Sequence, residues 1–370
     1  MIIAQVLAAI FWVCVGLLVY THVGYPLLLA LLTRVRPGAR DRRSDPMSPR
    51  VTLVVAAYNE AAVIARKIEN ARALDYPDLE VIVASDGSTD DTVAQAAGAD
   101  VVLDLPRGGK IRAQDAAVAQ ATGQIVAFSD ANSFWQPDAL RRLVAPFADP
   151  KVGYVCGQVR FVNEGGDNQE GLYWRYEMWI RSMESRLAGV TGGNGAIYAV
   201  RRDAYIQVDP RMGHDLSFPF NMVKRGWRPV YAPDARADEK MVPSIEGEFR
   251  RKRRMQAHMW PIVLRGGLAS PRGYSPLYAL EVYSHRVLRY LTPLLHVVAF
   301  GANIALLDDG WVYIATFAAQ CALLLAALIA RGPLRIARYY VAMTAAIAVA
   351  FFDWLRTGTP AGWEQAEGTR

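Results

Sequence analysis

The segment "LEVIVASDGSTDDT", residues 79–92, passes from an apolar run into a turn that holds three aspartates. Its first seven residues have the composition and length of a β-strand, and Asp86 follows where that strand ends. The same change occurs in "VTLVVAAYNE", 51–60, and in "QIVAFSDANS", 124–133. Strands that are apolar along their whole length are typical of a parallel sheet covered by helices on both faces.

Helices are predicted between these strands. Ile64, Ile68 and Ala71 recur at helical spacing, and Lys110–Thr122 is rich in alanine. The segment "DDTVAQAA" predicts a short helix, and the apolar residues 101–103 predict a further short strand. This alternation of strands and helices predicts an open α/β sheet with right-handed crossovers.

Polar residues stand at the carboxyl ends of the predicted strands, where such sheets bind their ligands. Asn59 and Glu60 follow the first strand, Asp86 the second and Asp130 the last. A dinucleotide-binding domain needs a Gly-x-Gly-x-x-Gly turn after the first strand. The segment "AAYNEAAV" contains no glycine, so hydride transfer to a nicotinamide is not expected.

Asp130 and Asn132 are two residues apart at a strand end. Oxygen ligands at this spacing suit Mg²⁺ or Mn²⁺, which in turn bridges a diphosphate. Lys110, after "RGG", is a candidate second cation for the same diphosphate. The alternatives are that Asp86 only forms a turn or caps a helix, and that Lys110 is an ordinary surface lysine.

Long apolar runs predict membrane helices. Met1–Thr33, Tyr290–Leu307 and Gly310–Ala330 contain no charged side chain, and each approaches or exceeds the ~20 residues that cross a bilayer. The first run lacks a signal-peptide cleavage pattern and is predicted to be a retained anchor. Tyr339–Phe352 is shorter and is also compatible with a re-entrant helix.

The net charge of +6 is concentrated beside the apolar runs. Asp308 and Asp309 lie between the second and third run, so the positive-inside rule places residues 35–287 in the cytoplasm. The position of the basic clusters favours anionic lipid over nucleic acid as their partner. The clusters consist of Arg34, Arg36, Arg40, Arg42 and Arg43, of Arg250, Arg251, Lys252, Arg253 and Arg254, and of Arg331, Arg335 and Arg338.

Three cysteines, none of them in a Cys-x-x-Cys pair, predict neither a disulfide framework nor a zinc site.

The positions of the apolar runs and the basic clusters divide the sequence into six segments. The segments are an anchor (1–33), a basic linker (34–50), a cytoplasmic α/β domain (51–260), interfacial helices (261–287), C-terminal transmembrane helices (288–355) and a tail (356–370).

The motifs "AAYNE", "SDGSTDDT", "GGK" and "SDANS", in this order, resemble the nucleotide-binding half of family 2 glycosyltransferases. Downstream, 192–202 and 213–239 resemble the acceptor-side segments of that family. The apolar runs resemble those of its membrane-embedded bacterial members, the exopolysaccharide and hyaluronan-synthase-like group. The resemblance implies a GT-A domain with a mixed, mainly parallel sheet, flanked by transmembrane helices in the bacterial inner membrane.

The resemblance also implies roles for individual residues. Asp215 matches the catalytic base, which takes the proton of the acceptor hydroxyl; its alternative role is to cap a helix over 216–225. The residues implied to bind the nucleotide sugar are Tyr58, Glu60, Asp86, Lys110, Asp130 and Asn132, of which Asp130 and Asn132 also hold the divalent cation. The acceptor and diphosphate side comprises Gly193, Asn194, His214, Arg253, Arg254, Gln256 and Trp260.

Three positions depart from the family pattern. Asn132 replaces the second acid of Asp-x-Asp, and His214 stands where Glu or Asp is more usual. In "QAHMW", 256–260, Met259 replaces the arginine of the Gln-x-x-Arg-Trp motif of processive synthases, although Arg253 or Arg254 is a candidate substitute. This replacement weakens the expectation of processive synthesis.

The expected function is inverting transfer of a hexose from a nucleotide-diphosphate sugar, a UDP-sugar first, to a glycan or lipid-linked acceptor in polysaccharide biosynthesis. One alternative is a single transfer to a polyprenyl-linked or other lipid acceptor. Another is a non-enzymatic sugar-binding transporter or receptor. A homo-oligomer and an export partner both remain open.

Overall fold

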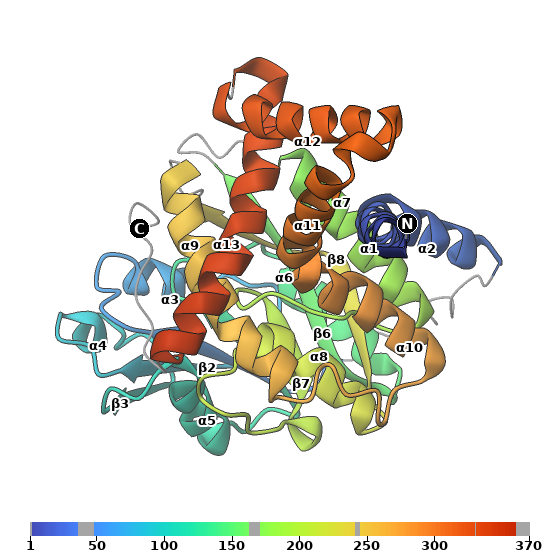
Figure 1. Ribbon diagram of the computed structural model, residues 1–370. Helices are drawn as coiled ribbons and strands as arrows, with labels where there is room; N and C mark the ends of the chain where they lie inside the picture. The colour runs from blue at the N-terminus through green and yellow to red at the C-terminus, as the bar shows by residue number, and fades with distance from the viewer. Residues whose placement is uncertain (1, 36–47, 163–170, 241–244, 330, 360–370) are drawn as a thin grey trace. The chain divides into compact units, whose positions relative to one another are not determined.

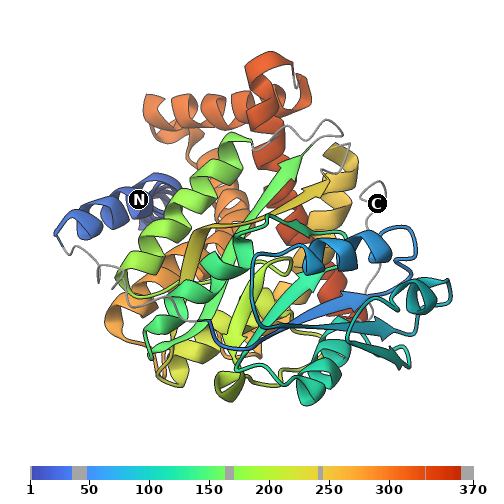
Figure 2. The same ribbon diagram turned by 180° about the vertical axis from the view of Figure 1, so that it is seen from behind.

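The computed structural model describes every residue except 1, 36–47, 163–170, 241–244, 330 and 360–370 (Figures 1 and 2). The basic linker and the tail fall largely on residues outside this described part. The chain divides into two compact units. The membrane unit comprises Met1–Leu31, Ser244–Trp260 and Val282–Gly358, and the sheet unit is built mainly from Leu32–Pro243 and Pro261–Glu281.

The described part of the sheet unit contains an eight-stranded sheet in the order β3-β2-β1-β4-β7-β6-β8-β5. The pairs β3/β2, β2/β1, β1/β4 and β6/β8 are parallel, and the other three are antiparallel. The predicted mixed, mainly parallel sheet is confirmed. The strands are β1 (Val51–Ala57), β2 (Leu79–Asp86), β3 (Val101–Leu105), β4 (Ile125–Asp130), β5 (Phe134–Trp135), β6 (Val152–Val162), β7 (Tyr198–Arg201) and β8 (Arg228–Lys240).

Helices cover both faces of this sheet, which explains why its first strands are apolar throughout. Leu53 and Val55 pack into one core with α3 and α6, whereas Val54 packs into a second core with α5, α7 and α8. The helices of this unit are α3 (Ile64–Arg72), α4 (Thr92–Gln95), α5 (Lys110–Gln120), α6 (Ala139–Val144), α7 (Leu172–Leu187), α8 (His214–Lys224) and α10 (Pro276–Glu281).

The register of the central strands aligns their carboxyl ends. Ala57 on β1 pairs with Ser85 on β2, and Ala56 pairs with Asp130 on β4. The residues that follow these pairs therefore emerge at one edge of the sheet. This edge carries Tyr58, Asp86 and Asp130.

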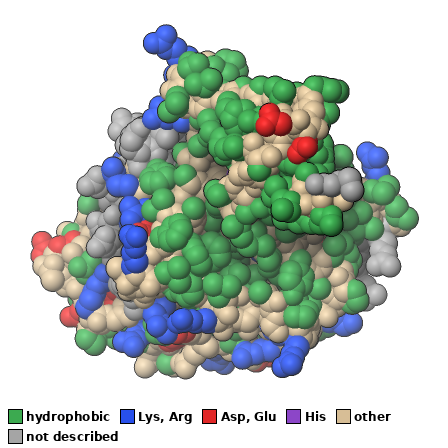
Figure 3. Space-filling model, in the orientation of Figure 1, with side chains coloured by type: hydrophobic (Ala, Val, Ile, Leu, Met, Phe, Trp, Pro, Cys, Tyr) green, Lys and Arg blue, Asp and Glu red, His purple; other side chains and the backbone are tan. Residues whose placement is uncertain are grey.

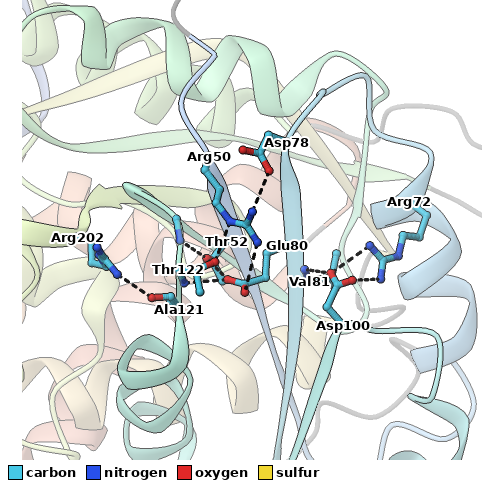
Figure 4. Close-up of polar contacts among 11 residues, drawn as sticks. Arg50, Thr52, Arg72, Asp78, Glu80, Val81, Asp100, Ala121, Thr122 and Arg202 are labelled. Atoms are coloured by element: carbon cyan, nitrogen blue, oxygen red, sulfur yellow. Dashed lines mark hydrogen bonds and ion pairs between the residues drawn. The ribbon is translucent and has the colours of Figure 1, made fainter.

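A polar network surrounds Glu80 at the amino ends of β1 and β2, opposite the polar edge (Figure 4). The Glu80 carboxylate accepts hydrogen bonds from the Thr52 hydroxyl at 2.5 Å and from the Thr122 amide at 2.9 Å. Burial alone raises the pKa of Glu80, but these hydrogen bonds and the charge of Arg50 bring it below its ordinary value. The network ties the first residues of β1 and β2 to Thr122, in the segment that precedes β4.

The membrane unit is helical. The described residues contain four helical segments long and apolar enough to cross a membrane: Ile2–Val35, Pro276–Ala305, Trp311–Ile329 and Gly332–Thr357. Figure 3 shows hydrophobic side chains gathered over α11, α12 and α13. The helices are α1 (Ile2–Val19), α2 (Tyr25–Val35), α9 (Ile245–Leu264), α11 (Leu288–Ala305), α12 (Trp311–Ile329) and α13 (Arg335–Thr357).

The last helix is longer than its apolar run. Tyr339–Phe352, whose 14-residue length is also compatible with a re-entrant helix, lies within α13, which has 23 residues. Asp353 lies inside the helix and pairs with Arg253 at 2.6 Å. Helix α10 continues through a π-helical turn, Val282–Val287, into α11, so the predicted boundary between residues 287 and 288 falls within a continuous helix.

Candidate functional site

A small pocket opens at the polar edge of the sheet. The structure brings together all six side chains that the sequence assigned to nucleotide-sugar binding, from the ends of β1, β2 and β4 and the start of α5. The pocket is lined by Tyr58, Glu60, Asp86, Lys110, Asp130 and Asn132, with Ala56, Ala57 and Ala131 between them.

Asp86 also organises the turn that precedes Lys110. One of its carboxylate oxygens accepts hydrogen bonds from the Gly108 amide at 2.6 Å and the Gly109 amide at 2.8 Å. The other oxygen forms an ion pair with Arg107. Since the Asp86 side chain is only 5% exposed, these contacts fix both the acid and the turn at the pocket wall.

Arg107 was not predicted from the sequence. Its guanidinium carbon lies 3.4 Å from the centroid of the Tyr58 ring, where it forms a cation–π contact. Gly87 has a φ of +67°, and a side chain there would approach the Arg107 backbone nitrogen to 2.7 Å. Arg107 thus stacks on one face of the Tyr58 ring at the pocket wall. The only sequence signal was an arginine three residues before Lys110.

Lys110 and Asp130 form an ion pair inside the pocket, with side chains 14% and 17% exposed. The Gly195 backbone lies beside this pair. A Cβ atom at Gly195 would stand 3.2 Å from the Lys110 Nζ and 4.0 Å from an Asp130 oxygen. The absence of a side chain at this position leaves room next to both charged groups.

The Gly-rich loop, residues 192–196, contains Gly195 and is held in place by hydrogen bonds to neighbouring segments. The Gly193 amide donates to the Asp215 carbonyl at 2.6 Å, and Arg181 on α7 donates to the Gly193 carbonyl at 3.1 Å. The Asn194 amide group donates to the Gly157 carbonyl at 2.7 Å. A side chain at Gly193 would collide with the Tyr154 hydroxyl. Gly193 and Asn194 therefore shape the loop.

Asp215 lies in the first turn of α8 and is half-buried. It is not among the residues that line the pocket. Its backbone carbonyl contacts the Gly-rich loop two residues from Gly195. Burial raises the pKa of the Tyr198 phenol, and the charges of both Asp130 and Asp215 raise it further. The contact that ties Asp215 to the Gly-rich loop is made by its backbone carbonyl.

His214 is a core residue in this structure. Its ring is 3% exposed, stacks on Phe218 at 4.1 Å, and shares a 2.8 Å hydrogen bond between its Nδ1 and the Tyr198 hydroxyl. Burial and the charge of Lys110 lower the pKa of His214 to about 3. His214 was predicted to lie on the acceptor and diphosphate side. For His214 to contact an acceptor, this aromatic cluster would have to open.

The remaining predicted residues lie on α9 in the membrane unit, with Arg254 beside Arg253. The Arg253 guanidinium pairs with Asp353, and the Trp260 indole donates to the Ile347 carbonyl at 3.2 Å. Met259, at the position of the missing arginine, accepts a hydrogen bond from Tyr290 at 2.9 Å. The Gln256 side-chain oxygen is buried without a hydrogen-bond partner.

The donor set of the pocket suits Mg²⁺ or Mn²⁺. Asp130 offers a carboxylate and Asn132 an amide, and both line the pocket. Within the described residues no cluster of three or more His, Cys, Asp and Glu side chains forms a complete metal cage. Mg²⁺ is commonly held by one or two carboxylates together with substrate phosphates, which is the arrangement that this pocket permits.

Lys67 lies beneath the turn that carries Asn132. Its side chain is fully buried, and its Nζ donates to the Ser133 carbonyl at 2.5 Å. Burial lowers the pKa of Lys67 to about 7, although the charges of Asp130 and Glu239 oppose the shift. Lys67 was not predicted from the sequence.

The shifted pKa of Lys67 predicts a pH-dependent stability. An unfolded lysine titrates near ~10.4, so between pH 7 and 10 the unfolded chain binds more protons than the folded one, and folding becomes more favourable as pH rises. We expect the difference in Tm between Lys67→Met and the wild type to move in favour of the wild type from pH 7 to pH 10. Thermal unfolding of both proteins across this range measures it, and a constant difference would contradict it.

Comparison with known proteins agrees with this geometry. Residues 52–209 match the model of the family described as glycosyl transferase family 2. The chain carries a family 2 glycosyltransferase domain. This domain has the GT-A fold, and its matched region contains all six pocket side chains.

The glycosyltransferase domain has similar proteins in bacteria and archaea. An N-acetylglucosaminyltransferase of Rhizobium meliloti (strain 1021) is 27% identical over 284 residues, 68% of this chain and 66% of that protein. A poly-beta-1,6-N-acetyl-D-glucosamine synthase of Staphylococcus aureus (strain COL) is 25% identical over 245 residues, 62% and 60% of the two chains. The chain thus spans less than two thirds of the length of both curated relatives.

A solved structure also resembles the glycosyltransferase domain and its flanking helices. A mannosyltransferase from Pyrobaculum calidifontis, in complex with GDP-Man and Mn²⁺, has a TM-score of 0.70 and 26% identity. The match covers 94% of this chain and 99% of that one. The similarity extends beyond residues 52–209 to nearly the whole chain.

Proposed function

We propose that the protein is a membrane-anchored inverting hexosyltransferase that takes its sugar from a nucleoside-diphosphate donor. The observation that carries this proposal is the convergence of Tyr58, Glu60, Asp86, Lys110, Asp130 and Asn132 on one pocket. An aromatic ring, acids and a lysine around one space suit a base, hydroxyl groups and a diphosphate. The catalytic domain faces the cytoplasm of the bacterial inner membrane, where nucleotide sugars are available.

In this proposal the nucleoside and the diphosphate of the donor bind to different sides of the pocket. Tyr58 and Arg107 offer flat faces to the base, and the Glu60 and Asp86 carboxylates accept hydrogen bonds from nucleoside groups. Lys110 moves from Asp130 to the diphosphate, where its charge stabilises the departing nucleotide. Asp130 and Asn132 would hold Mg²⁺ or Mn²⁺, which would supply further positive charge beside the phosphates.

Asp215 is the proposed general base. It takes the proton from the acceptor hydroxyl as that oxygen attacks the anomeric carbon, and the bond to the nucleoside diphosphate breaks on the opposite side. A single displacement inverts the anomeric configuration. The Gly-rich loop, which touches Asp215 through Gly193 and the Lys110–Asp130 pair through Gly195, is the proposed floor for the transferred sugar.

Two classes of donor are candidates, UDP-hexoses and GDP-mannose. The curated relatives are named for N-acetylglucosamine, whereas the similar solved structure contains GDP-Man. We propose a UDP-hexose, with UDP-N-acetylglucosamine first, and GDP-mannose as the competing donor. The acceptor is a glycan or a lipid-linked sugar at the membrane surface.

A single transfer per acceptor is favoured over processive synthesis by one observation. Met259 stands in place of the arginine of the Gln-x-x-Arg-Trp motif, and it accepts a hydrogen bond from Tyr290 on α11. Trp260 of the same motif is 8% exposed and packs against Tyr290 and Phe351. This segment is thus used for packing between helices of the membrane unit.

Product length tests both parts of the proposal. The purified full chain, incubated with labelled UDP-N-acetylglucosamine, UDP-glucose or GDP-mannose, Mn²⁺ and membrane lipid extract, is expected to yield a product one sugar longer than its acceptor. A long polymer formed while acceptor is in excess would contradict single transfer. No incorporation from any of the donors, with sugar binding intact, would favour the non-enzymatic alternative.

A further inference from the structure

Lys67 occupies a position that normally belongs to an apolar residue. It lies on α3 between the buried residues Ile64 and Ile68, and no part of it reaches solvent. Moving an ammonium group from water into the protein interior carries a large desolvation cost. A methionine of similar length fills such a space without this cost. The contacts of the Lys67 Nζ therefore indicate why a lysine stands at this buried position.

The Lys67 Nζ contacts the turn between β4 and β5. It donates a 2.5 Å hydrogen bond to the Ser133 carbonyl and lies 5.3 Å from the centroid of the Trp135 ring. Ser133 directly follows Asn132, and its own amide donates to the Asp130 carbonyl at 3.2 Å. The Lys67 Nζ thus holds the backbone of the turn through a hydrogen bond, while Asp130 and Asn132 line the pocket.

Asn70, one turn further along α3, holds the other end of the same turn. Its side-chain amide donates to the Trp135 carbonyl at 2.8 Å, and its side-chain oxygen accepts from the Trp135 amide at 2.8 Å. The Trp135 indole in turn donates to the Ala196 carbonyl at 3.1 Å. One face of α3 therefore anchors both the Asp130–Asn132 turn and, through Trp135, the Gly-rich loop.

We propose that Lys67 is a positioning residue that fixes the Asp130–Asn132 turn for a divalent cation and a diphosphate. This inference rests on the proposed function. Lys67 acts through the Ser133 carbonyl and does not touch the donor.

The first test measures the turn in the ligand-free full chain. In Lys67→Met, hydrogen exchange at the Ser133 and Trp135 amides is expected to be at least ~10-fold faster, while Tm is unchanged or raised because a buried charge has been replaced by an apolar group. Arg72→Met on the same helix, which removes an exposed pair with Asp100, is the matched control and should leave this exchange unchanged. If Lys67→Met does not fold, Lys67→Gln, which keeps a donor without the charge, replaces it.

The second test measures binding without turnover. Titration of Mn²⁺ and UDP into the detergent-solubilised variants, followed by Mn²⁺ electron paramagnetic resonance, is expected to give ~10-fold weaker binding for Lys67→Met than for the wild type and Arg72→Met. Unchanged exchange together with unchanged affinity would overturn the inference, as would a fall in Tm with no local effect. If the wild type binds neither UDP nor GDP with Mn²⁺, the proposed function fails, and the exchange result still decides whether Lys67 positions the turn.

Discussion

Replacing Asp215 with asparagine is expected to lower kcat by ~10²–10⁴-fold, the usual contribution of a general base, and to leave donor binding unchanged. The variant keeps the shape of the side chain and the backbone contact between Asp215 and Gly193. Only the ability to accept a proton is lost. Because the residue lies in the first turn of α8, losing its charge also costs about 0.3–1 kcal/mol of helix-dipole stabilisation, so a modest fall in Tm is expected.

A matched variant separates the base from a general effect of charge. Asp234→Asn removes an acid whose side chain is 61% exposed and which pairs with Arg142 and Arg236. Its kcat should remain within about twofold of the wild type. Equal activity in Asp215→Asn and Asp234→Asn, with both proteins folded, would show that another group accepts the proton.

Replacing Asp130 with asparagine is the second change with a large expected effect. It removes the only charged oxygen ligand that the Asp130/Asn132 pair offers, and the carboxylate that pairs with Lys110. Interactions of a charged group are typically worth about 1.5–3 kcal/mol, so Mn²⁺-dependent nucleotide affinity should fall ~10–100-fold. Calorimetric titration with and without Mn²⁺ measures this change.

The control for Asp130→Asn is Asp104→Asn, which changes an exposed acid on β3. It should bind nucleotide with wild-type affinity and the same dependence on Mn²⁺. If Asp130→Asn retains the metal dependence of the wild type, the cation is held elsewhere, and the roles given to Asp130 and Asn132 are wrong.

The positions of the pocket residues were predictable because strand ends are visible in the sequence. Asp86 and Asp130 each end an apolar run, and the register of β2, β1 and β4 then brings those ends to one edge. The role of Asp215 came only from the family resemblance, since a single Asp at a helix start is equally typical of a cap.

Other parts of the site depend on contacts that are distant in the sequence. Arg107 reaches Tyr58 and Asp86 across a turn, and no periodic pattern marks such a contact. Lys67 did carry a signal, because it interrupts the apolar stripe of Ile64, Ile68 and Ala71 on a helix face that must be buried. A lysine within an otherwise apolar helix face is either exposed at the border of that face or buried with a specific contact. Only the folded structure shows which of the two applies.

The burial of His214 illustrates the same limit. Its place beside Asp215 in the sequence suggested a role at the acceptor, but successive helical residues point in different directions. His214 turns into the aromatic core with Phe218 and Tyr198, whereas Asp215 stays half-buried. Adjacent residues on a helix therefore need separate arguments.

Thermal stabilisation of the full chain by a panel of nucleotide sugars, with and without Mn²⁺, shows whether one pocket binds a nucleotide-diphosphate sugar together with a divalent cation. At ~100 times the Kd, a true donor stabilises the folded state by about 2.7 kcal/mol. We expect at least one of UDP-N-acetylglucosamine, UDP-glucose and GDP-mannose to raise Tm when Mn²⁺ is present, and Asp130→Asn to reduce this stabilisation to about half or less at the same ligand concentration. No shift with any donor, or the same shift without metal and in Asp130→Asn, would contradict this expectation.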